Sequence, residues 1–396
     1  MVVPGRCMTA RALQGLKVVE VGAGVAAPFA AKLLCDMGAD VVKVEAPGDG
    51  DESRGWGPFP GDARDGEKSG MFHYLNAGKR SIALDVAAAE GRAVVQALLD
   101  VADAVIVNGD VAAIESMQLD PRSLQPRFPR LVVTTITPFG FDGPLRDCRA
   151  HDITICSLGA VTAAVGEPKR PPLTPPLGLS DYQSGVAAAS GTMLALFARE
   201  RRSAGQHVDI SPLDVWATVH QGSGFTNFVN FGKTRGRAGR RRREAYPFQF
   251  LEASDGLMCL IARDGAQWKR FIDLVGARAL LENPRYQDRL AMGLDYPDEV
   301  DEILRPWFAE RTRDEIFALC RENRIPFAPV RRIDEVMHCE QLASRGFFQT
   351  LPARPDGVSF VVPGAPYRFS GTPASIAAPA PRLGEHREQV LREWTR

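Results

Sequence analysis

The sequence predicts an α/β protein in which a parallel sheet carries helices on both faces, together with a smaller domain of strands and helices. Short β-branched runs alternate with helix-like segments over the first third of the chain, which is the pattern of a parallel sheet. The composition shifts near residue 225, just before a basic stretch. The length of 396 residues is enough for two or three domains at about 150 residues each.

The expected elements follow one another closely in the first half of the chain. A strand at 16–21 leads into a helix that begins near Pro28 and ends before Gly38, because proline suits a first helical turn and glycine suits a helix end. The other expected strands and helices are strands at 40–45, 81–84, 104–107 and 131–136, helices at 90–101 and 182–200, and a short strand within 205–211.

Long irregular segments interrupt this pattern. The segment 47–70 is rich in Gly, Asp and Pro, and a loop of that length inside an α/β unit is usually functional or disordered. The segment 364–381 is rich in Pro and Ala, which favours an extended chain draped over another surface. We therefore expect a large domain that begins with 1–225, a linker and small domain at 226–330, and a return segment at 331–396 that completes the large domain.

The bulk composition excludes several classes of protein. The 48 Lys and Arg balance 48 Asp and Glu, whereas proteins that grip nucleic acid or an anionic membrane need surplus positive charge. No apolar run approaches the roughly 18 residues of a membrane span, and residues 1–14 lack the apolar core of a signal peptide. The seven cysteines and six histidines are scattered without ligand spacing, so we expect a cytoplasmic protein with reduced thiols and no metal site.

The turn after the first strand resembles a nucleotide-binding signature. Gly22-Ala23-Gly24-Val25-Ala26-Ala27 fits G-x-G-x-x-G/A, and Glu45 ends the next strand about 20 residues later. This spacing predicts a Rossmann-like domain that binds a dinucleotide, with Glu45 on a ribose hydroxyl. The alternatives are another adenine nucleotide, or small residues that only let the helix pack on the sheet.

Asp181 and His151 are the candidate catalytic residues. Asp181 lies at the start of the long helix, where an Asp is usually an N-cap that accepts backbone hydrogen bonds. The functional alternative is a nucleophilic carboxylate that attacks an activated carbonyl. His151 lies 30 residues upstream, because 181 − 151 = 30. Near Asp181 it would give two groups able to move protons.

Ordered short motifs run over nearly the whole chain. The early motifs are Gly15 to Glu20, Gly38 to Glu45, Arg54-Gly55-Trp56 and Asn76 to Ser81. The later ones are Phe139-Gly140 with Gly143-Pro144, His151-Asp152, Ser180-Asp181 with Gly185, Gly205 to Asp209, and Leu383 to His386. Together these motifs resemble the class III CoA-transferases, a family that also includes α-methylacyl-CoA racemase.

The resemblance implies a large α/β domain built from both chain ends, a small domain, and a homodimer of interlocked protomers. It also implies that the glycine turn holds coenzyme A, which enters as the substrate acyl-CoA, rather than a nicotinamide or flavin. By the same carry-over Asp181 is the nucleophile. Its attack on an acyl-CoA gives an aspartyl anhydride, from which the returning CoA thiolate forms an enzyme-bound thioester for the incoming carboxylic acid.

The residues expected to bind CoA depart from the family pattern at two places. Ala46 stands where the family often has Arg, and Asn108-Gly109-Asp110 replaces a segment that supplies another phosphate ligand. The expected contacts are Val25, Ala26, Arg54, Lys79, Arg80, Leu84, Asn108 and Arg149, with the basic stretch 235–243 as a further source of cations.

Two alternatives to a transferase remain open from the sequence. The family's racemases carry His at the position of His151 and use it with the equivalent of Asp181, but Tyr182-Gln183-Ser184-Gly185 is not their glycine-rich run. The segment Arg263 to Gln267 also differs from their Glu-Pro-Gln. The missing phosphate ligands also fit a non-catalytic subunit of a heteromeric transferase.

Overall fold

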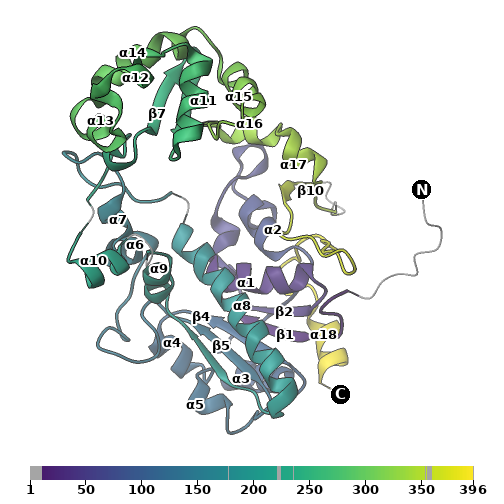
Figure 1. Cartoon of the computed structure of the whole chain (residues 1–396). Helices are drawn as coiled ribbons and strands as arrows, with labels where there is room; N and C mark the ends of the chain where they lie inside the picture. Colours follow the sequence, from purple (N-terminus) through teal and green to yellow (C-terminus); the bar gives the residue numbers. More distant parts are fainter. Residues whose placement is uncertain are drawn as a thin grey trace. The chain divides into compact units, whose positions relative to one another are not determined.

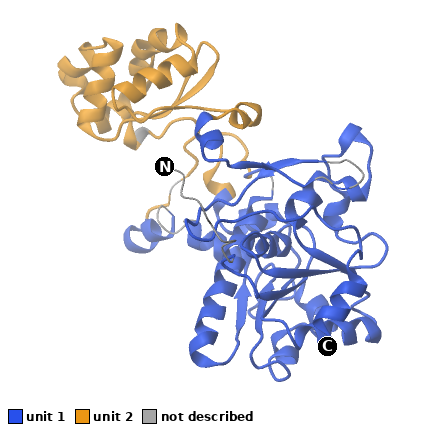
Figure 2. Cartoon of the chain, turned by 90° about the vertical axis from the view of Figure 1, so that its right-hand side faces the viewer, with its two compact units in different colours: residues 1–161, 175–232, 340–396 blue, residues 162–174, 233–339 orange. Residues whose placement is uncertain are grey.

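The computed structural model describes residues 11–176, 178–220, 224–234, 236–352, 354 and 359–395 (Figure 1). The chain divides into two compact units: unit 1 comprises 1–161, 175–232 and 340–396, and unit 2 comprises 162–174 and 233–339 (Figure 2). The expectations for residues 1–10 and for Arg235 fall outside the described residues. The domain boundaries at 225 and 330 stay predictions.

A six-stranded sheet forms the centre of unit 1, and all its neighbouring strands are parallel. Its order is β3-β2-β1-β4-β5-β6. The direction of winding therefore reverses between β1 and β4. This confirms the predicted α/β class with a parallel sheet. The strands are β1 Lys17–Val21, β2 Asp40–Glu45, β3 Arg80–Ala83, β4 Ala104–Asn108, β5 Val132–Ile136 and β6 His207–Ile210.

Helices cover both faces of this sheet. Helices α1 (Ala26–Asp36) and α8 (Leu179–Arg202) share a hydrophobic cluster with Val18 of β1. Val19, the next residue, belongs to the opposite cluster with α3 (Ala89–Leu99) and α18 (Arg387–Trp394). Successive side chains of a strand point to opposite faces, so both faces of the central strands are buried.

Small residues bring α1 and α8 close together. A Cβ on Gly185 would lie 2.8 Å from the carbonyl oxygen of Ala26 and 3.1 Å from the ring of Phe29. Only glycine fits at this approach, so the first turns of α8 lie directly against the start of α1 (Figure 1). Both helices begin earlier than expected, at residues 26 and 179 instead of 28 and 182.

Shorter helices fill the connections of unit 1. The expected long loop at 47–70 contains the 3₁₀ helices η1 Glu52–Gly55, η2 Pro60–Asp62 and η3 Gly66–Lys68, and leads into α2 Gly70–Asn76. The others are α4 Val111–Ser116, α5 Pro121–Leu124, α6 Asp152–Leu158, α7 Val161–Ala164, which ends across the boundary of unit 2, α9 Pro212–His220, α10 Phe225–Phe231 and α17 Glu340–Ser344.

The C-terminal segment returns to unit 1. Strands β10 (Phe348–Thr350) and β11 (Val361–Pro363) pair antiparallel, and an extended stretch then leads to α18 beside the edge strand β3. Trp394 of α18 is buried and donates its Nε1–H to Asp40 at 3.1 Å. Residues that precede and follow unit 2 in the sequence therefore share one hydrophobic core.

Unit 2 has its own core of strands and helices, as expected of a smaller α+β domain. Its antiparallel strands are β7 Phe248–Ala253, β8 Gly256–Ile261 and β9 Ala328–Pro329. Its helices are α11 Gly265–Val275, α12 Ala279–Glu282, α13 Arg289–Asp295, α14 Pro297–Ala309, α15 Arg313–Glu322 and α16 Ile333–Met337, with the 3₁₀ helices η4 Arg243–Ala245 and η5 Pro284–Tyr286.

Candidate active site

The glycine turn lies between β1 and α1, where the winding of the sheet reverses. Asn108 at the end of β4 accepts the Ala23 N–H at 2.9 Å and donates to the Ala23 carbonyl at 3.0 Å. A Cβ on Gly22 would lie 2.2 Å from the Asn108 Oδ1. The turn is therefore pinned to the neighbouring strand, at the reversal of strand order where α/β sheets place their ligands.

Buried charged side chains bond to the backbone of this turn. The Lys43 ammonium contacts Glu20 at 2.6 Å and Asp51 at 2.7 Å, and donates to the Gly22 carbonyl at 2.9 Å. Asp51 in turn accepts the Gly24 N–H at 3.1 Å. Burial works against the charge on Lys43, but the Asp51 and Glu20 carboxylates raise its pKa overall. We call Glu20, Lys43, Glu45, Asp51, Arg54 and Lys79 the buried network.

Lys79 is a member of the buried network and is not open to solvent. Its ammonium donates to Glu20 at 2.7 Å, to the Asn76 Oδ1 at 2.8 Å and to the Pro28 carbonyl at 2.8 Å. Its side chain is 0% exposed, and burial lowers its pKa to about 8. All three donor positions of the ammonium are thus occupied inside the protein.

Glu45 and Arg54 form a bidentate pair in the same network. Arg54 Nε and Nη2 donate to the two Glu45 oxygens at 2.7 and 2.9 Å. Ser81 and the Asp51 N–H also donate to the Glu45 carboxylate. Burial opposes its charge, but the Arg54 hydrogen bonds and Lys43 lower its pKa overall. Glu45, the acid that would bind a ribose hydroxyl in a dinucleotide site, therefore already accepts hydrogen bonds from protein groups on both of its oxygens.

Asp181 lies in the first turn of α8 but does not cap it. The N-cap is Gly178, whose φ of 63° is left-handed, and no side chain caps the helix. The expectation that Asp181 is an ordinary N-cap is therefore wrong. Its Oδ2 lies 3.7 Å from the Cβ position of Gly178. Burial, Asp152 and Glu52 raise the pKa of Asp181 to about 6, with His151 acting in the opposite direction.

Asp152 fixes the position of the two candidate catalytic residues. It is the first residue of α6, and its Oδ1 accepts the Ser180 N–H at 2.9 Å as well as the Ser180 hydroxyl. His151 precedes it as an exposed N-cap residue. The bonds between Asp152 and Ser180 hold the start of α6 against the first turn of α8, and the His151 charge acts on Asp181. The role of the two residues as a proton-handling pair stays a prediction.

Glu52 completes the cluster and was missed from the sequence. Its Oε1 lies 2.7 Å from the Cβ position of Gly24, and the Trp56 Cη2 lies 3.4 Å from that position. Burial and Asp51 raise the pKa of Glu52, while His151 lowers it. The available signal was its place in the long loop, two residues before the Arg54-Gly55-Trp56 motif. We call Glu52, His151, Asp152 and Asp181 the carboxylate cluster.

Four of the expected CoA contacts lie around the glycine turn. Val25 and Ala26 form the start of α1, and Asn108 pins the turn. Arg149 contacts Asp110, just after β4, through Nε at 2.7 Å, and its side chain is 87% exposed. Arg149 therefore offsets the negative charge that Asp110 brings to this end of the sheet.

The other four expected contacts lie elsewhere. Arg54 and Lys79 are in the buried network. Arg80 lies at the amino end of β3, at the opposite end of the sheet from the glycine turn, and pairs with Asp40 and Glu393. Leu84 packs in the hydrophobic cluster with α3 and α18. Arg54, Lys79 and Leu84 are buried, and contact of these four side chains with CoA stays a prediction.

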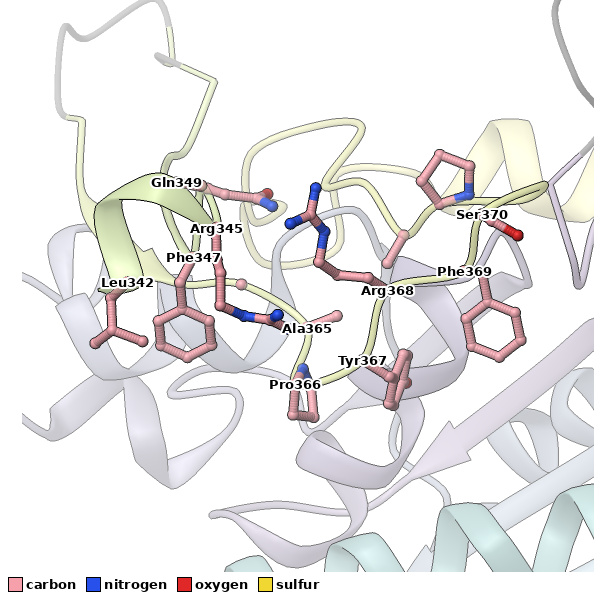
Figure 3. Close-up of a pocket in the computed structure, with 14 residues that line it drawn as sticks. Leu342, Arg345, Phe347, Gln349, Ala365, Pro366, Tyr367, Arg368, Phe369 and Ser370 are labelled. Atoms are coloured by element: carbon pink, nitrogen blue, oxygen red, sulfur yellow. The ribbon is translucent and has the colours of Figure 1, made fainter. Parts of the chain in front are cut away.

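A separate hollow of about 890 Å³ lies in the C-terminal part of unit 1 (Figure 3). Arg345 and Arg368 flank it together with Phe347, Tyr367 and Phe369. No residue of the carboxylate cluster lines it. Within the described ranges no group of three or more His, Cys, Asp or Glu could hold a metal ion. No helix among those residues is long and apolar enough to cross a membrane.

Comparison with known proteins gives one family. The model of CoA-transferase family III matches residues 13–387. Succinate–glutarate CoA-transferase of Agrobacterium fabrum is 32% identical, over 96% of this chain and 95% of that protein. Succinyl-CoA–L-malate CoA-transferase beta subunit of Chloroflexus aurantiacus is 30% identical, over 96% and 93%. The crystal structure of a CAIB/BAIF family protein from Brucella suis matches with a TM-score of 0.85 and 30% identity, over 97% and 100%.

Proposed function

The chain belongs to CoA-transferase family III, and we propose that it moves CoA from an acyl-CoA thioester to a carboxylic acid with Asp181 as the nucleophile. The observation that carries the proposal is the Asp181 carboxylate itself. It is half-buried and caps no helix, and its pKa is raised to about 6 by burial, Asp152 and Glu52. At neutral pH it is ionised yet more basic than an ordinary aspartate, which suits a nucleophile.

The proposed reaction proceeds through two kinds of acyl-enzyme. An Asp181 oxygen attacks the thioester carbon, the C–S bond breaks, and an anhydride and CoA thiolate result. The thiolate attacks the aspartyl carbonyl, which releases the donor acid and leaves CoA bound to Asp181 as a thioester. The acceptor carboxylate then displaces the thiolate to form a second anhydride. Attack of the thiolate on the acceptor carbon yields the new acyl-CoA and regenerates the Asp181 carboxylate.

We propose that CoA binds along the glycine turn and the start of α1. The first amides of a helix have no partners within it and favour anionic groups, and Ala26 and Ala27 occupy this place in α1. Arg149 is the exposed cation beside this end of the sheet that we assign to a CoA phosphate. Lys79 and Arg54 then serve the protein rather than the ligand, because they hold Glu20 and Glu45.

The acids and the assembly also belong to this proposal. The names of the relatives pair succinate with glutarate and succinyl-CoA with malate, so we propose a small dicarboxylic acid on at least one side of the reaction. We propose a cytoplasmic homodimer, supported by exposed apolar side chains on α8, namely Val186, Leu194 and Phe197. The relative named as a beta subunit makes a heteromer the alternative, and sedimentation of the purified chain distinguishes a dimer from a monomer that needs a second polypeptide.

Trapping of the acyl-enzyme tests the central step. Hydroxylamine added during turnover should convert Asp181 to its hydroxamate, which peptide mass spectrometry locates. An Asp181→Asn variant should lose activity by at least roughly 10³-fold. The matched control is Asp214→Asn, an exposed carboxylate in the first turn of α9, which should keep full activity. Full activity in Asp181→Asn, or a hydroxamate on another residue, refutes the mechanism.

An acyl-CoA racemase is the second candidate, because His151 precedes Asp152, which bonds to Ser180 beside Asp181, and the His151 charge acts on Asp181. A two-base racemase would exchange the α-hydrogen of a branched acyl-CoA with deuterated water when no acceptor acid is present. A transferase shows no such exchange and forms a new CoA ester only when an acid is added. Mass spectrometry of the CoA esters under both conditions separates the two functions.

A further inference from the structure

The backbone at Glu52 is held firmly although its side chain is exposed. Asp51 caps η1 by accepting the Ser53 N–H at 2.8 Å, and the same carboxylate accepts the Gly24 N–H at 3.1 Å. The Lys43 ammonium also contacts the Asp51 carboxylate at 2.7 Å. The residue that follows Asp51 is therefore fixed at one place beside the glycine turn.

The Glu52 carboxylate points onto that turn without a partner. Its Oε1 lies so close to Gly24 that a Cβ there would be 2.7 Å away. Among the described residues no hydrogen bond or ion pair to its side chain is formed, in contrast to Glu45 and Asp51 in the same loop region. No hydrogen bond or ion pair within the described part of the chain neutralises the Glu52 charge, so only solvent and His151 weaken its effect on neighbouring groups.

Asp181 and His151 are the candidate catalytic residues that interact electrostatically with Glu52. The first turns of α8 pack on the start of α1, through the contact between Gly185 and Ala26, and the glycine turn leads directly into that start. Glu52 acts electrostatically on Asp181, and His151 acts on both. Asp152 is the other charged group that acts on Asp181. The Asp181 charge in turn helps to raise the pKa of Cys156 and of Tyr182, after the larger effect of burial.

We propose that Glu52 is a positioning residue for the transfer reaction proposed above: its unpaired carboxylate, seated on Gly24, faces Asp181 across the start of α1 and sets the reactivity of that nucleophile. A neighbouring negative charge makes loss of the Asp181 proton harder, so the ionised form that remains is more basic and attacks a thioester faster. Glu52 forms no bond with the substrate in this role and acts through Asp181 alone.

Glu52→Gln removes the charge and keeps the shape of the side chain, which makes it the informative substitution. Glu52→Asp keeps the charge. Glu90→Gln is the control, because Glu90 is an exposed glutamate in the first turn of α3, on the other face of the sheet. The exposed position of Glu52 predicts that each variant folds with an unchanged thermal midpoint.

Two measurements test the proposal. The first is the pH dependence of carbodiimide labelling at Asp181 in the substrate-free protein, followed by peptide mass spectrometry, since only the protonated carboxyl reacts. The second is the acid limb of the pH profile of kcat/KM. In Glu52→Gln both midpoints should fall below the value near 6 by roughly half to one pH unit. The activity at high pH should fall about threefold because the carboxylate is less basic. Glu52→Asp and Glu90→Gln should keep the original midpoints.

The labelling separates this proposal from the proposed function. An unchanged labelling midpoint in Glu52→Gln overturns the role of Glu52, whatever the activity. A shifted labelling midpoint without transferase activity in any variant supports the coupling of Glu52 to Asp181 and refutes the transferase. A shifted midpoint and a shifted acid limb together support both.

Discussion

The buried network and the carboxylate cluster both lie beside the glycine turn, and both contain aspartate and glutamate. Their carboxylates are paired with cations in the buried network and, within the described ranges, unpaired in the cluster. In the network Glu20, Glu45 and Asp51 each contact a lysine or arginine within 2.7 Å. In the carboxylate cluster Asp181 and Glu52 have no such partner among the described residues, and both carry a raised pKa. Pairing, rather than residue type or position in the sequence, separates a structural charge from a reactive one.

The boundary between the two regions runs between consecutive residues. Asp51 belongs to the buried network and accepts a hydrogen bond from Gly24, whereas the exposed Glu52 side chain contacts the same glycine without a hydrogen bond. Three experiments can break or sharpen this comparison.

Loss of the central cation of the network should have the largest effect. Lys43→Met leaves Glu20 and Asp51 buried with one counter-charge fewer, and breaking a buried pair costs about 3–5 kcal/mol of unfolding free energy. Lys68→Ala is the control, because it breaks an exposed pair with Asp65 at 3.0 Å worth about 0–1 kcal/mol. Urea unfolding measures both. Equal losses would mean that the network does not support the fold as argued.

Arg149 and Lys79, which the sequence analysis both expected to bind CoA, should differ in their effects on KM and on stability. Arg149→Ala should raise KM for acyl-CoA about tenfold with little change in unfolding, since Arg149 is exposed. Lys79→Met should instead lower the unfolding midpoint and leave KM nearly unchanged, because its ammonium is enclosed by Glu20, Asn76 and Pro28. Exposed Arg122→Ala is the control for lost surface charge. A raised KM in correctly folded Lys79→Met would return Lys79 to the ligand site.

The smallest expected effect is a gain in stability. Asp181 has a folded pKa of about 6 against an ordinary 3.8, so the folded state holds the proton more tightly than the unfolded chain. Its favourable contribution is present below pH 3.8 and is lost as the pH rises through about 6. Asp181→Asn should therefore stabilise the protein by about 1 kcal/mol at pH 8 and by almost nothing at pH 4. A destabilised Asp181→Asn at pH 8 would contradict the account of an unpaired carboxylate.

The sheet could be predicted from the sequence because each strand is a short apolar run bounded by a clear turn. Val18, Val41 and Val132, for example, are buried on the sheet face that α1 and α8 cover. The glycine turn, Asn108 and Asp181 could be placed because they lie where strands end or a helix begins. The N-cap expectation for Asp181 failed because Gly178, in a left-handed conformation, starts the helix earlier.

The roles of the cations could not be predicted from the sequence. Lys79 lies 59 residues from Glu20 in the chain, and only the folded chain decides which lysine is enclosed. Glu52 was missed for the converse reason, because nothing local distinguishes an acid without a cation from its paired neighbour Asp51.

The way α18 closes the sheet has a consequence for the order in which the protein forms during synthesis. Trp394 bonds to Asp40 across 354 residues, and Val390 joins the cluster that covers one face of the sheet. Unit 2 is encoded entirely between β6 and the return segment, apart from the stretch 162–174. A ribosome therefore releases nearly all of unit 2 before α18 exists. The inserted unit can fold while the edge strand β3 still lacks the helix that packs beside it and stays accessible to chaperones.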